Sequence, residues 1–96
     1  MEDKEYNNIK RTILRKMLRH EYIGGKHTSI ENLPKGFPKD SKGKVKGVIK
    51  KMISEGYFIV KKKPDSQHVS LNPRRLPEII KELEVDLFDS ENNKST

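Results

Sequence analysis

The sequence predicts an α+β fold in a single domain that covers residues 1–88. Three segments, centred near Ile13, Val48 and Ile79, carry apolar residues three and four positions apart, which is the spacing of helices with one buried face. Between the second and third of these segments, residues 57–71 contain two runs that favour β-strands, separated by turn-forming residues. With 96 residues, the chain has room for one such domain and not for two.

The composition limits the size of the core and indicates the cellular compartment in which the protein is expected. Hydrophobic residues make up 31% of the chain and charged residues 36%, so the core must be small. There is no cysteine, which excludes a disulfide scaffold and thiol chemistry and fits a reducing environment. No apolar run approaches the roughly 18 to 20 residues of a membrane span, and residues 1–4 are too charged to begin a signal peptide. We therefore expect a cytoplasmic protein with no membrane partner.

The first predicted helix covers residues 3–21, with Ile13 and Met17 on its buried face. Paired glycines at 24–25 are expected to stop it, because glycine favours turns over helix continuation. A short segment of extended backbone is predicted at residues 26–28.

A second, shorter helix is predicted to follow. Residues 28–31, Thr-Ser-Ile-Glu, read as a capping box in which a hydroxyl caps the helix and Glu31 reaches back. Pro34 and Gly36 limit this helix to about two turns.

The third predicted helix covers residues 41–55, with Asp40 or Ser41 as its cap and Gly56 as its stop. Its apolar stripe consists of Val45, Val48, Ile49, Met52 and Ile53. A β-hairpin of residues 57–62 and 68–71 comes next.

A last helix is predicted to begin at Asn72, a good cap, with Pro73 in the first helical position. The residues expected to be buried on it are Leu76, Ile79, Ile80, Leu83 and Leu87. Beyond residue 88 the sequence predicts a flexible acidic and polar tail, residues 89–96.

This order of elements is the one expected for a winged helix-turn-helix. The stretch from Thr28 to Pro77, and within it residues 28–33, 45–57 and 68–73, resembles the small archaeal winged-helix DNA-binding proteins. The resemblance implies a three-helix core with a β-hairpin wing and an additional C-terminal helix. It also implies that residues 41–55 form the recognition helix and residues 61–67 the wing.

Basic charge is concentrated in one third of the chain. The net charge is +7, and residues 35–63 hold ten lysines against only Asp40 and Glu55, so the rest of the chain is close to neutral. A contiguous basic segment is typical of a face that binds an anionic partner, and nucleic acid is the first candidate. A solvated lysine surface is the alternative.

On a helical wheel, the predicted third helix presents Gly43, Gly47 and Lys50 opposite its apolar stripe. The two exposed glycines have two interpretations. Either this surface of the helix is poorly optimised for stability, or a partner approaches the backbone closely at these positions. The hairpin turn likewise has two interpretations: it is either a wing that contacts DNA or a tip exposed to solvent. The candidate DNA contacts are Ser41, Lys42, Lys44, Lys46, Gly47, Lys50, Lys51, Lys61, Lys62, Lys63, Gln67 and His68.

Base edges are most often read by arginine on guanine or by asparagine and glutamine on adenine, and residues 41–55 contain none of these. Lysine mainly contacts phosphates, so we expect binding that depends strongly on salt and only modestly on sequence.

No catalytic or metal site is predicted. His20, His27 and His68 are far apart in the sequence and lack helical pairing, and Glu78 and Glu82 fit a solvated helix face. We therefore expect a protein that is not an enzyme and needs no cofactor.

The leading hypothesis is a double-stranded DNA-binding protein, acting as a small transcriptional regulator or a nucleoid-type binder. A homodimer is expected, because the first and last helices offer more apolar surface than a small core absorbs. Two alternatives remain: a protein that binds structured RNA or the ribosome, and a protein-interaction module whose basic face docks on an acidic partner.

Overall fold

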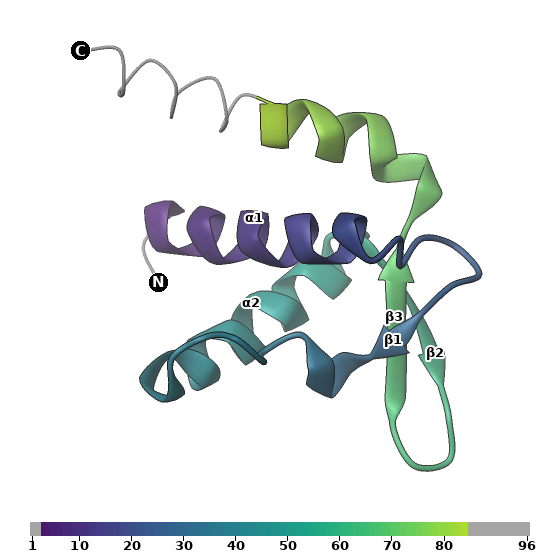
Figure 1. Ribbon diagram of the computed structural model, residues 1–96, viewed down its shortest axis with the longest axis horizontal. Coiled ribbons are helices and arrows are strands. Elements are labelled where there is room, and N and C mark those ends of the chain that lie inside the picture. The colour runs from purple at the N-terminus through teal and green to yellow at the C-terminus, as the bar shows by residue number, and fades with distance from the viewer. Residues whose placement is uncertain (1–2, 85–96) are drawn as a thin grey trace.

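The computed structural model describes residues 3–84, which form an α+β domain of helices packed on one antiparallel sheet (Figure 1). The predicted fold class is confirmed at this level. The elements are α1 (Asp3–Arg19), β1 (Thr28–Ser29), the 3-10 turns η1 (Ile30–Asn32) and η2 (Lys39–Ser41), α2 (Lys42–Ser54), β2 (Phe58–Lys62), β3 (Gln67–Leu71) and the 3-10 turn η3 (Pro73–Arg75). Residues 76–84 then form a helix, called the closing helix below. The predicted tail, residues 89–96, lies outside the described residues.

The sheet confirms the predicted hairpin, and β1, which begins at the last residue of the extended segment predicted at residues 26–28, adds a third strand to it. The strand order is β1-β3-β2, with β3 in the centre and all pairs antiparallel. The backbones of Lys63 and Ser66 bond to each other across the hairpin turn. Because side chains alternate along a strand, Phe58 and its partner Leu71 face the core, whereas Lys61 and its partner His68 lie on the opposite face.

The core lies between the helices and the sheet. Figure 1 shows α1 between the closing helix and α2, with the β2–β3 hairpin projecting beyond them. The apolar stripes predicted for the first and third helices are confirmed, since Ile13, Met17, Val45 and Met52 are completely buried. Close packing of these stripes fixes the orientation of both helices about their own axes.

The segment between α1 and α2 differs from the prediction. In place of a two-turn helix, the chain makes the single 3-10 turn η1, with Pro34 following closely. The cap is Ser29, whose hydroxyl accepts a bond from the Glu31 backbone, so the predicted capping box does not form. Thr28 is instead paired with Val69 in the sheet, which places the helix start one residue later.

Helix α1 ends at Arg19, two residues earlier than predicted and well before the paired glycines. The terminator is Glu21, which adopts a left-handed backbone with φ 58°. The Tyr22 N–H bonds to the Met17 carbonyl at 2.9 Å and the Glu21 N–H to the Leu18 carbonyl at 3.0 Å, which is the Schellman pattern. Gly56 occupies the equivalent position after α2, with φ 83°.

We expect Glu21→Gly to raise the free energy of unfolding by about 0.5–1 kcal/mol, because glycine adopts the left-handed conformation without steric cost. Gly56→Ala is the reciprocal change and should lower it, since the new Cβ would also lie 3.3 Å from the Arg75 guanidinium. Urea denaturation of both variants measures the two effects. A Glu21→Gly variant less stable than the wild type would contradict this explanation.

The beginnings of the later helices also differ from the prediction. Ser41 precedes α2 but makes no capping bond through its side chain. Asn72 does cap, accepting a bond from the Arg74 backbone at 3.1 Å, but the turn that it caps is η3, and the closing helix starts only at residue 76.

The predicted burial of the last helix is partly wrong. Ile79 is fully buried and Leu83 nearly so, whereas Ile80 is 45% exposed. The two side chains point about 100° apart around the helix, and only the side that carries Ile79 and Leu83 faces the core. Leu87 lies outside the described residues.

Within residues 3–84, no helix combines the length and the apolar character needed to cross a membrane.

Candidate nucleic-acid interface

The orientation of α2 determines which of its lysines share a face. Val45, Val48, Ile49 and Met52 are buried, which leaves Gly43, Gly47, Lys50 and Ser54 on the opposite, exposed side. A Cβ added at Gly43 or Gly47 would meet no atom within 4 Å. The fold itself therefore does not require glycine at these positions, and they are the part of the helix where a partner can come closest to the backbone.

A groove of about 300 Å³ runs between α2, η1 and the start of β3, and we call it the α2–wing groove. Lys46 and Lys50 enter it from α2, and Gln67 enters it from the hairpin. Glu31 is the only carboxylate in the lining. The complete lining is Ile30, Glu31, Pro34, Lys46, Ile49, Lys50, Ile53 and Gln67. The structure thus brings together predicted site residues that are up to 21 positions apart in the sequence.

The pleat of the sheet separates the hairpin lysines. Lys62 pairs with Gln67, so its side chain leaves the hairpin on the same face as this residue of the groove. Lys61 pairs with His68 on the other face. Lys61, Lys62 and Lys63 are all exposed, and no ion pair involves them in the described part of the chain.

Two of the predicted α2 contacts point away from the groove. Lys44 forms an ion pair with Glu5 of α1 at 2.8 Å, and the hydrogen bond and charge of this carboxylate raise the pKa of Lys44. The Lys51 ammonium lies 4.3 Å from the centre of the Tyr6 ring. These lysines belong to the α1 side of the molecule.

The remaining predicted contacts lie at the beginning of α2. Lys42 is exposed. Ser41 is partly buried and lines a hollow against the first turns of α1, together with Asn8 and Phe37. This places Ser41 outside the α2–wing groove.

A histidine pair that sequence spacing did not reveal lies on the outer face of the sheet. The Nδ1 atoms of His27 and His68 are 2.9 Å apart, and the rings meet edge to face. One ring must donate and the other accept, so this bond requires at least one neutral imidazole. Partial burial, followed by the charges of Lys63, His68 and Lys61, lowers the pKa of His27.

This lowered pKa predicts a loss of stability in acid. Above the ordinary histidine pKa of 6.5, His27 is neutral in both states and has no effect. Below it, the unfolded chain takes up a proton that the folded chain resists, so the free energy of unfolding falls as the pH falls. We expect His27→Gln to reduce the difference in stability between pH 8 and pH 5.5, measured by urea denaturation. An unchanged difference would contradict this assignment.

Lys10 forms a second polar cluster that sequence analysis missed. Its ammonium is buried, lies 2.7 Å from Glu82 of the closing helix and 3.4 Å from the Tyr57 hydroxyl, and faces the Tyr6 ring. Burial lowers the pKa of Lys10, but the bond to Glu82 and its charge, with help from Tyr57, raise it more. The cluster fastens the closing helix to α1. Its signal in the sequence was a lysine within the apolar stripe, four residues after Tyr6.

Among residues 3–84, no three His, Asp or Glu side chains come together in a way that could hold a metal ion. Comparison of the chain with protein-family models, curated proteins and solved structures found no match.

Proposed function

We propose that the protein binds double-stranded DNA through the α2–wing groove. The observation that carries this proposal is the convergence of Lys46 and Lys50 from α2 with Gln67 from the hairpin. Neither lysine has a carboxylate partner within the described chain, so their charges are available to phosphates. The order of helices and strands is compatible with a winged helix-turn-helix, in which α2 enters the major groove and the hairpin flanks it.

Modest sequence selectivity is part of this proposal. The helix supplies only lysine as a strong donor, while Gln67 is the one groove residue whose amide can make two bonds to an adenine edge. Most of the affinity then comes from phosphates, with a small contribution from bases. Such a protein suits the role of a small transcriptional regulator or a nucleoid-type binder, and a homodimer would double the phosphate contacts.

The test is binding to random-sequence fluorescent duplex DNA between about 50 and 300 mM salt. With about six phosphate contacts, the logarithm of the affinity should fall against the logarithm of the salt concentration with a slope near −5. No binding at the lowest salt would refute the proposal and favour an acidic protein partner. Efficient competition by folded RNA would favour the RNA-binding alternative.

A further inference from the structure

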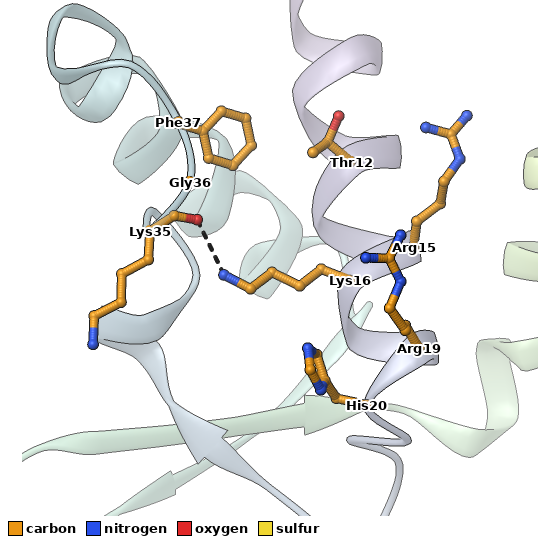
Figure 2. Close-up of a pocket in the computed structure, with 8 residues that line it drawn as sticks. All are labelled: Thr12, Arg15, Lys16, Arg19, His20, Lys35, Gly36 and Phe37. Atoms are coloured by element: carbon orange, nitrogen blue, oxygen red, sulfur yellow. Dashed lines mark hydrogen bonds between the residues drawn. The ribbon is translucent and has the colours of Figure 1, made fainter.

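A second basic cavity lies beside α1. It has a volume of about 420 Å³, within the roughly 300–1,000 Å³ typical of small-molecule sites. It lies between the C-terminal half of α1 and the turn at residues 35–37 (Figure 2). The lining residues are Thr12, Arg15, Lys16, Arg19, His20, Lys35, Gly36 and Phe37. None of them lines the α2–wing groove.

The lining is strongly basic, and none of the lining residues in the described part of the chain is a carboxylate. Two arginines and two lysines contribute formal positive charge, and His20 adds a fifth basic side chain. Burial, together with the neighbouring charge of Lys35, lowers the pKa of Lys16. Burial and this neighbouring charge both disfavour the protonated lysine, and an anion in the cavity would favour it.

Lys16 is held in place by the backbone of the opposite wall. Its ammonium donates to the Asn32 carbonyl at 2.8 Å and to the Lys35 carbonyl at 3.1 Å, and Figure 2 shows the second of these bonds spanning the cavity. A lysine has three N–H donors, so one remains after these two bonds. The bonds also fix the distance between α1 and the turn, and thus the width of the cavity.

Arg19 lies three residues after Lys16, so the two side chains leave α1 about one turn apart on the same side, whereas Figure 2 shows Arg15 extending away from Lys16. The guanidinium group is a planar fork that matches two oxygens of a phosphate, and lysine adds a point charge beside it. One ordered ammonium beside one such fork is suited to a tetrahedral oxyanion.

We infer that this cavity binds a phosphate group, either on a free phosphorylated molecule such as a nucleotide or on the backbone of a nucleic acid. The inference goes beyond the proposed function and does not depend on it, because the two sites share no residue. Phosphate oxygens accept from Lys16 and Arg19, while exposed Lys35 adds charge at the rim.

The experiment is a titration of the full chain with inorganic pyrophosphate at about 50 mM salt, where screening is modest. Amide signals are followed by NMR, and binding should shift those of residues 12–20 and 35–37. Arg19→Gln/Lys35→Gln changes two exposed positions and should weaken binding at least about tenfold. Lys62→Gln/Lys63→Gln removes the same charge from the hairpin and should leave pyrophosphate binding unchanged.

Absence of these shifts at millimolar pyrophosphate, or equal binding by Arg19→Gln/Lys35→Gln and the wild type, would overturn the inference. When binding is observed, duplex DNA added to the complex separates the two sources of phosphate. Mutual competition identifies a backbone phosphate as the ligand, and simultaneous binding identifies a free phosphorylated molecule. A protein that fails to bind DNA can still pass the pyrophosphate test, so the two proposals fail independently.

Discussion

Replacing Lys46 and Lys50 together by glutamine is expected to weaken binding to duplex DNA by roughly 30- to 100-fold at about 100 mM salt. Each phosphate contact adds about 0.9 to the salt slope and close to a factor of ten in affinity at this salt concentration. The slope should therefore become shallower by about two. Fluorescence anisotropy over a series of salt concentrations measures both quantities.

The matched control is Lys44→Gln/Lys51→Gln, which removes two charges from the same helix. Because Lys44 pairs with Glu5 and Lys51 lies over the Tyr6 ring, this variant should lose little affinity and retain the wild-type slope. Equal losses in the two variants would show that binding follows net charge alone. That result would remove the α2–wing groove as the site.

The second large effect concerns stability. Ile79→Ala is expected to lower the free energy of unfolding by about 2–5 kcal/mol, because it leaves a cavity in place of most of a completely buried side chain. The total free energy of unfolding of a native domain is about 5–15 kcal/mol, so this variant should unfold at a clearly lower urea concentration. Circular dichroism during a urea titration measures the change.

Ile80→Ala removes the same atoms from the neighbouring residue and should cost less than about 1 kcal/mol, since Ile80 is 45% exposed. Comparable losses at the two positions would contradict the described packing. If the loss at Ile80 grows with protein concentration, a second copy of the chain covers this residue, as the predicted homodimer requires.

Much of the fold could be predicted because local patterns carry it. The apolar stripe of α2, from Val45 to Met52, repeats with the period of a helix and has only one face that can be buried. In the hairpin, alternation of Val69 and Leu71 with polar neighbours likewise identified the inner face of the strand. In both cases the sequence period indicates the face that meets the core, although Ser70, between the two strand residues, is also buried and donates its hydroxyl to the Gly24 carbonyl.

Two of the predictions that were wrong, the end of the first helix and the start of the second, have a different cause. The end of α1 depends on the left-handed Glu21, a conformation that glutamate rarely adopts, so the paired glycines were a better local signal than the actual terminator. In the second helix, pairing of Thr28 with a strand 41 positions later moves the start of the turn η1 one residue along the chain. Local propensity contains no information about such a partner.

For the candidate sites, the sequence by itself determined that the chain is basic, that ten lysines fall between residues 35 and 63, and that α2 exposes a face of glycine and lysine. Only the tertiary structure decided which of these lysines act together. It turned Lys44 and Lys51 toward α1, placed Lys46 and Lys50 beside Gln67, and assembled the second basic cavity from α1 and the turn at 35–37. The physical reason is that periodicity fixes a side chain's direction about its own helix axis, whereas packing between distant segments decides what lies in that direction.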